Sequence, residues 1–194
     1  MSQTSLLFIF IDSFIINNIV LMVFLGICPF LGVSGKLDTA FRMGVAVIFV
    51  LLVSSSMTYG LNLLLIKWHA EYLRIISYIV VIAATVQLVE MFIKKSSPGL
   101  FRALGIYLPL ITTNCCVLGV AMFQTFREYN FAQSMVFSLG SGMGFTLALV
   151  IMAGIREQLN LADVPSIAKG TGIALMVAGI LSMAFMGFAG LGTL

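Results

Sequence analysis

Charged residues are scarce in this sequence: Asp, Glu, Lys and Arg make up only 9% of its 194 residues, whereas 61% are hydrophobic. A soluble globular domain carries roughly 25% charged residues, because water has to solvate its surface. So little charge excludes a water-soluble domain of ordinary composition. Apolar side chains on the outside are compatible with lipid as the surrounding solvent, so the composition predicts an integral membrane protein.

Several motifs are also absent, and each absence excludes a class of function. There is no cluster of Lys and Arg with interleaved aromatics, so a nucleic-acid partner is not expected. There is no G-x-G-x-x-G after a strand, no Walker loop and no pair of histidines for haem, since His69 is the only histidine. Three cysteines are too few for a disulfide framework. The first residues lack the basic region of a cleaved signal peptide, so we expect them in the mature chain.

What the sequence does contain is long apolar runs. A run of about 20 mostly apolar residues can cross the hydrocarbon core as a helix. Six such runs are present, with most of the charges between them, which predicts an all-α integral membrane protein with six transmembrane helices. The runs are Leu6–Gly32, Met43–Ile66, Ile75–Ile93, Leu104–Phe126, Phe131–Ile155 and Thr171–Leu191.

The basic residues between the runs predict the orientation. Cytoplasmic loops carry an excess of Lys and Arg. The odd-numbered loops hold seven basic residues and the even-numbered loops hold three, so we expect the odd loops in the cytoplasm and both termini outside. The odd-loop residues are Lys36, Arg42, Lys94, Lys95, Arg102, Arg156 and Lys169, and the even-loop residues are Lys67, Arg74 and Arg127.

A short internal repeat connects the first run with the fourth. Residues 28–33 and 115–120 both read C-x-x-L-G-V, and three predicted spans separate them. An odd number of spans in each half gives the halves opposite orientations, as in inverted-topology repeats. The expected architecture is therefore a 3+3 inverted repeat in one membrane domain, with residues 1–98 as the first repeat and 99–194 as the second.

Helix-breaking residues gather at both copies of the repeat. Gly26, Pro29 and Gly32 surround the first cysteine, and Pro109 and Gly119 flank the second. Proline removes a backbone donor, and irregular backbone at membrane depth needs protein or a water-filled cavity to satisfy it. We therefore expect broken or half-membrane helices at the first and fourth spans, with cysteines near the breaks.

The matched cysteines have two interpretations. Free cysteine often packs in a core as a small apolar residue. Two thiols at symmetric positions instead suggest a metal centre or a redox pair. Zinc usually takes four N or S ligands, and a [2Fe–2S] cluster takes four thiolates, so a partner chain, either a second copy or a homologue, would have to complete either site. The repeat aligns Cys115 with Cys28, so Cys116 is assigned to packing.

Polar residues beside the cysteines are candidates for the environment of such a centre. Asn114, Thr113 and Thr112 could donate hydrogen bonds to cluster sulfurs, or make ordinary hydrogen bonds between helices. Gly26 and Pro29 lie at the first break and belong to the same candidate environment.

Acidic residues within the runs are the candidates for an ion path. Glu90 and Gln87, one turn apart in the third run, are the residues considered. Glu90 also lies four residues before Lys94, a spacing that favours a local ion pair. Asp12 lies at the outer interface or deeper, and Gly140 with Gly144 forms a G-x-x-x-G that predicts only close helix packing.

The segments around both cysteines, "NNIVLMVFLGICPFLGVSGKL" and "LGIYLPLITTNCCVLGVA", resemble one family of membrane proteins. It includes the A-type component of the Rnf electron-transport complex and the E-type component of the sodium-translocating NADH:quinone reductase. The resemblance runs over essentially the whole chain, including "ADVP" and "MAFMGFAGL".

The resemblance implies a function as well as a fold. It implies a homologous partner of opposite topology, the Rnf E-like component, with one intramembrane [2Fe–2S] cluster between the two chains and two cysteines from each. Carried over, the ligands here are Cys28 and Cys115; the family pattern Asn-Cys-Ala reads Asn-Cys-Cys here.

Further implications concern the complex. Its other subunits carry flavins and iron–sulfur clusters, and it passes electrons between ferredoxin and NAD⁺ while moving Na⁺ or H⁺. The implied location is the cytoplasmic (inner) membrane of a bacterium or archaeon. The alternative from the residues alone is a secondary transporter of a small solute or ion, which also uses inverted repeats but leaves the matched cysteines without a role.

Overall fold

The structure is a computed structural model that describes residues 5–69, 71–96, 108–161 and 170–188. Within these ranges all regular secondary structure is helical and there is no strand, which confirms the all-α class. Three described helices are long and apolar enough to cross a membrane, and they lie in α3, α4 and α8. Three shorter apolar stretches of the described chain accompany them, Leu6–Ile16, Leu110–Phe126 and Thr171–Met186.

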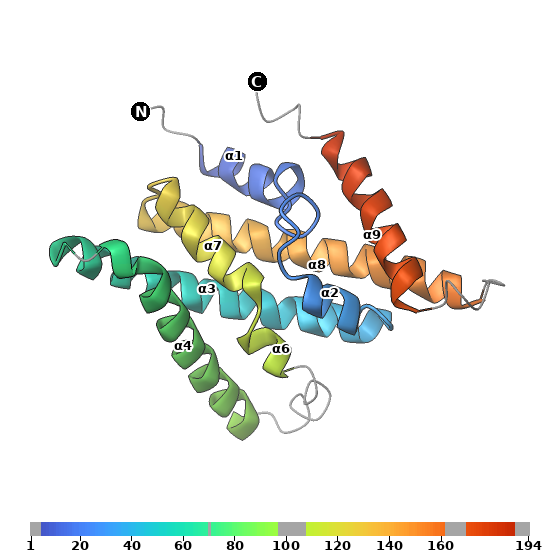
Figure 1. Ribbon diagram of the computed structural model, residues 1–194, viewed down its shortest axis with the longest axis horizontal. Coiled ribbons are helices and arrows are strands. Elements are labelled where there is room, and N and C mark those ends of the chain that lie inside the picture. Colours follow the sequence, from blue (N-terminus) through green and yellow to red (C-terminus); the bar gives the residue numbers. More distant parts are fainter. Residues whose placement is uncertain (1–4, 70, 97–107, 162–169, 189–194) are drawn as a thin grey trace.

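Two long helices form the centre of the molecule. α3 (Leu37–Lys67) and α8 (Phe131–Leu161) each have 31 residues and lie side by side in opposite directions (Figure 1). At 1.5 Å per residue each is about 46 Å long, more than the roughly 30 Å of the hydrocarbon core. Glycines allow the close approach: a Cβ on Gly142 would lie only 3.1 Å from the Cα of Ile48.

Both helices extend past the predicted runs, and this changes the place of two arginines. The spans were predicted to begin at Met43 and to end at Ile155, which put Arg42 and Arg156 in loops. They lie inside α3 and α8 instead. Arg42 forms an ion pair with Asp38 at 3.0 Å, and Arg156 donates hydrogen bonds at the end of α2, so local polar partners carry the helices beyond their apolar cores.

The first apolar run is broken, as its glycines and proline predict. It forms α1 (Leu6–Ile11), the π-helical turn η1 (Asp12–Ile16) and α2 (Ile27–Val33), with non-helical backbone between η1 and α2. Asn18 stabilises this backbone, because its Nδ2 donates to Gly144 O at 2.8 Å and its Oδ1 accepts from Val20 N–H at 3.1 Å. Ser182 Oγ donates to Leu21 O at 2.6 Å.

The fourth run is also broken. It forms α6 (Leu108–Thr112) and α7 (Cys115–Phe126), and the predicted start at Leu104 lies outside the described residues. Asn114 caps α7, since its Oδ1 accepts from the Cys116 N–H at 3.0 Å. The expected broken helices at the first and fourth runs are therefore present.

Two further helices complete the described chain. A short 3₁₀ turn, η2 (Glu71–Leu73), precedes α4 (Arg74–Ser96), and α9 (Thr171–Met186) packs beside α8 and the break after η1. Trp68 and Tyr72 are 70% and 83% exposed where α3 turns into α4, which is typical of residues at a membrane interface. Many large apolar side chains are exposed along α3, α4 and α9, as lipid contact requires.

The predicted packing role of the G-x-x-x-G is confirmed. Gly140 and Gly144 of α8 face the backbone of α1 and η1, and a Cβ on Gly144 would lie 2.7 Å from Phe14 O. These glycines hold the first broken helix against the centre of the molecule.

Candidate metal centre

The two helix breaks meet in space. The Gly26 N–H, just before α2, donates a hydrogen bond to Cys115 Sγ, the first residue of α7, at 2.9 Å. Gly26 has a φ of 78°, a conformation that favours glycine. Cys28 follows Gly26 by two residues, in the first turn of α2. The fold therefore brings together the two segments that the sequence repeat singled out.

Exposure distinguishes the three cysteines. Cys28 and Cys115 are exposed, whereas Cys116 is fully buried, and none forms a disulfide. Adjacent residues on a helix point about 100° apart, so Cys115 and Cys116 face different surroundings. Burial thus agrees with the assignment of Cys116 to packing. The metal-binding role of Cys28 and Cys115 stays a prediction.

The donor set fits half of an iron–sulfur site. Two thiols at the starts of short helices lie where backbone N–H groups stabilise negative sulfur, and one such N–H already contacts Cys115. The described residues contain no group of three or more His, Cys, Asp or Glu side chains placed to hold a metal. A [2Fe–2S] cluster takes four thiolates, so this chain can supply two and a second chain has to supply the others.

Asn114 is the polar residue best placed beside the thiols. Its side chain is 5% exposed, and its Nδ2 has no hydrogen-bond partner among the described residues. Buried donors without an acceptor are rare, so a sulfur acceptor bound near Cys115 would satisfy this one. Of its neighbours, Thr112 is half-buried and Thr113 exposed. At the first break, Gly26 and Pro29 are buried.

Comparison with known proteins identifies the family. A family model described as "Rnf-Nqr subunit, membrane protein" matches residues 6–192. The chain belongs to the Rnf-Nqr family of membrane subunits. The resemblance inferred from the two cysteine segments is confirmed.

Relatives of this Rnf-Nqr subunit carry consistent names. The A component of the ion-translocating oxidoreductase complex of Syntrophotalea carbinolica is 55% identical over 188 residues, covering 96% of this chain and 97% of the relative. The A component of the Na⁺-translocating ferredoxin:NAD⁺ oxidoreductase complex of Acetobacterium woodii is 52% identical over 188 residues, covering 96% and 98%. The corresponding ion-translocating oxidoreductase component from Azoarcus sp. is 51% identical over 186 residues, covering 95% and 96%.

The predicted ion-path residues lie on α4, in the third predicted span of this Rnf-Nqr subunit. Gln87 is exposed and Glu90 is half-buried, toward the end of the helix. An exposed Gln87 does not line a path enclosed by this chain alone. Their role in ion movement stays a prediction.

A buried ion pair, which the sequence did not reveal, stabilises η1. Asp12 is 7% exposed, and its carboxylate accepts from Arg127 Nη1 at 3.1 Å and from Asn17 Nδ2 at 2.7 Å. Burial alone lowers the pKa of the Arg127 guanidinium, but hydrogen bonds to Tyr129 and Asp12 raise it above its ordinary value. Nothing local links positions 12 and 127, so only the fold could show the pair.

The Arg127→Met variant is expected to lose about 2 kcal/mol of stability, because it leaves the Asp12 carboxylate buried without its cation. The loss stays below that for a fully buried pair because the Arg127 side chain is 39% exposed. Thermal unfolding of the detergent-solubilised complex measures it. The double variant Asp12→Asn/Arg127→Met is expected to recover part of the loss; a double variant less stable than Arg127→Met would contradict this account.

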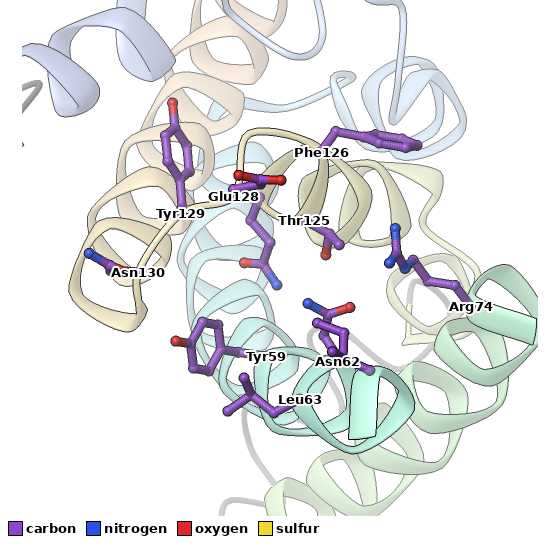
Figure 2. A pocket seen from close by; sticks show the side chains of 11 residues that line it. Tyr59, Asn62, Leu63, Arg74, Thr125, Phe126, Glu128, Tyr129 and Asn130 are labelled. Carbon is purple, nitrogen blue, oxygen red and sulfur yellow. The ribbon is translucent and has the colours of Figure 1, made fainter. Parts of the chain in front are cut away.

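A polar cavity of about 490 Å³ was also missed by sequence reasoning. It lies between the end of α3, the start of α4 and the end of α7, with Asn62 and Thr125 pointing into it (Figure 2). The residues lining it are Tyr59, Asn62, Leu63, Ile66, Arg74, Gln124, Thr125, Phe126, Glu128, Tyr129 and Asn130. Its signal in the sequence was the polar spacing along α3.

Proposed function

We propose that this chain is the A-type membrane component of an Rnf-type, ion-translocating ferredoxin:NAD⁺ oxidoreductase complex, and that it relays electrons across the bilayer through an intramembrane [2Fe–2S] cluster. The observation that carries the proposal is the meeting of the two helix breaks, with the exposed thiols of Cys28 and Cys115 beside them. Relatives aligned over at least 95% of the chain are named as the A component of such complexes.

The cluster is shared with a homologous chain of opposite topology. Cys28 and Cys115 bind the iron from this side, and two cysteines of that partner complete the four ligands. Exposure of both thiols on the surface of one chain supports a site between chains, because a site within one chain would bury its ligands.

The residues around the thiols orient the ligands and set the polarity. When bound, the cluster supplies one-electron transfer. The Gly26 N–H holds Cys115 Sγ in place and favours its thiolate, and the Asn114 Nδ2 is available as a second donor. Phe145, fully buried against the Gly26 backbone, excludes water from behind the site.

The breaks place the thiols away from the ends of the molecule. α7 runs 12 residues from Cys115 to Phe126, about 18 Å, before it reaches the turn into α8. A carrier near mid-depth divides a crossing of about 30 Å into two shorter transfers. This placement explains why helices that are otherwise apolar are interrupted.

The architecture that goes with this function is the six-span 3+3 inverted repeat, with residues 1–98 and 99–194 as its halves. Support comes from the breaks in both members of the repeat and from the three long apolar helices of the described chain. The boundary between the halves lies outside the described residues. Termini outside and location in the inner membrane of a bacterium or archaeon complete the proposal, with the basic-residue bias as support.

The chain acts as a subunit of a redox-driven ion translocase, without a complete active site of its own. Flavins, further iron–sulfur clusters and the nucleotide site belong to the other members of the complex. The sequence has no dinucleotide-binding or Walker motif, which fits a relay. A secondary transporter would leave two exposed thiols at matched breaks without use.

Iron content tests the proposal. In the purified complex, the double variant Cys28→Ala/Cys115→Ala is expected to lose about two iron atoms and one low-temperature EPR signal, because the cluster loses half of its ligands. Ferredoxin-dependent NAD⁺ reduction is expected to fall below detection. Gel analysis has to show that the whole complex remains assembled. An assembled double variant with unchanged iron and EPR would disprove the cluster role.

A further inference from the structure

One face of α3 carries polar residues in an otherwise apolar helix. Ser54, Thr58 and Asn62 follow one another at intervals of four, with Ser55 beside the first. This spacing keeps side chains on one face of a helix. Ser54, Ser55 and Thr58 are at most 2% exposed, so this face points into the protein and not into lipid.

Gln124 of α7 meets this face. Ser55 Oγ donates to Gln124 Oε1 at 2.5 Å, and Gln124 Nε2 donates to Thr58 Oγ1 at 2.9 Å. Gln124 is 2% exposed. An amide oxygen and a hydroxyl oxygen each have two lone pairs, so Gln124 Oε1 and Ser55 Oγ can accept further contacts beyond these bonds.

Buried oxygens without partners lie at the same level. Ser54, Ser134 and Ser138 are at most 1% exposed, and their hydroxyls have no hydrogen-bond partner among the described residues. Ser56 Oγ contacts Met135 Sδ at 3.7 Å, which puts Ser134 and Ser138 of α8 level with this part of α3. Buried hydroxyls are rarely left unpaired, so several together indicate a missing ligand. We call Ser54, Ser55, Thr58, Gln124, Ser134 and Ser138 the polar seam.

The cavity connects the polar seam with the outside. Gln124 lines both the cavity and the seam, and Asn62, whose Oδ1 has no partner among the described residues, lies two turns from Ser55 toward the cavity. Arg74 and Glu128, which have opposite charges, both line the cavity (Figure 2). The cavity lies beside the turns between α3 and α4 and between α7 and α8, at the end that the basic-residue bias assigns to the outside.

We propose that the polar seam binds a small monovalent cation of the Na⁺ class, through Gln124 Oε1 and the hydroxyl oxygens of Ser54 and Ser55, and that the cavity is its route of entry or exit. Hard cations take oxygen ligands, which the seam offers. Divalent ions usually need carboxylates, and the seam has none. The site deepens the proposed function and rests on it, because it places the translocated ion on this chain.

The proposed cation site is distinct from the thiols. Gln124 lies nine residues beyond Cys115 on α7, about 14 Å along the helix. Variants of the seam therefore leave the sulfur ligands and their backbone donor in place.

Binding of ²²Na⁺ to the purified complex, measured by scintillation proximity, tests the site directly. Gln124→Leu and the double variant Ser54→Ala/Ser55→Ala are each expected to raise the Kd of one Na⁺ site at least about tenfold, because cation ligands are removed. Ser56→Ala is the matched control, since Ser56 donates to Leu52 O of its own helix and is expected to leave binding unchanged.

Two results would overturn the site. Equal Na⁺ affinity and stoichiometry in wild type and both seam variants would show that the seam binds no cation. A loss of affinity in Ser56→Ala as large as that in the seam variants would show that the effect comes from a general disturbance of α3. Iron content and EPR of the same samples report the cluster separately, so failure of this site and failure of the electron relay are distinguishable.

Discussion

In a Cys115→Ala variant of the purified complex, the EPR signal of the shared [2Fe–2S] cluster is expected to disappear, whereas Cys116→Ala is expected to keep it. Cys115 is exposed beside the Gly26 N–H, and Cys116 is fully buried and points elsewhere. The two thiols are adjacent in sequence, so the comparison changes only the direction in which the sulfur faces. Low-temperature EPR after reduction, together with iron quantification, measures the outcome.

Stability measurements serve as the control for this pair. Cys116→Ala removes a buried sulfur and is expected to lower the unfolding temperature slightly, whereas Cys115→Ala removes a surface atom. A large loss of iron in Cys116→Ala with the signal intact in Cys115→Ala would reverse the assignment. Such a result would mean that α7 rotates by about 100° when its partner binds.

The second large effect is expected at Gly26. Gly26→Ala is expected to lower the stability of the complex by about 2 to 4 kcal/mol, the sum of a left-handed conformation for a residue with a Cβ and of overpacking. The φ of Gly26 is 78°, and its new Cβ would lie 2.7 Å from Phe145 Cε2 and 3.3 Å from Asn114 Oδ1. Because the Gly26 N–H holds Cys115 Sγ, the reduction potential of the cluster is also expected to shift.

Gly32→Ala is the matched control for Gly26→Ala. Gly32 belongs to the helix that Gly26 precedes, but a Cβ there would meet only Leu110 Cδ2 at an ordinary 3.7 Å. Thermal unfolding in detergent and redox titration followed by EPR measure both variants. Equal stability and equal potential in the two alanine variants would show that the Gly26 conformation does not support the site.

The two proposed sites lie on one short helix, which suggests how they affect one another. Cys115 begins α7 and Gln124 is close to its end, so the same rigid element carries a thiol and a cation ligand. A negative charge gained near Cys115 attracts a cation in the seam, and more strongly in a low-dielectric interior than in water. This electrostatic route would couple electron transfer to Na⁺ binding without a large conformational change.

Local composition determined much of the structure in advance. The scarcity of charge placed the protein in a membrane, and the crowding of Gly26, Pro29 and Gly32 predicted a break that the structure contains. These properties depend on neighbouring residues, since helix breaking and lipid solvation act over a few turns. Helix ends were predicted less well, because Arg42 and Arg156 found polar partners that apolar runs do not record.

By itself, the sequence determined that this is a helical membrane protein of the Rnf-Nqr type, with breaks in its first and fourth apolar runs and a cysteine at each. Only the tertiary structure decided that Cys115 is exposed while Cys116 is buried, that Asp12 pairs with Arg127, and that Ser55 meets Gln124. The partners in these last two contacts are 115 and 69 positions apart. Such contacts depend on how whole helices pack and rotate against one another, which no local pattern of residues specifies.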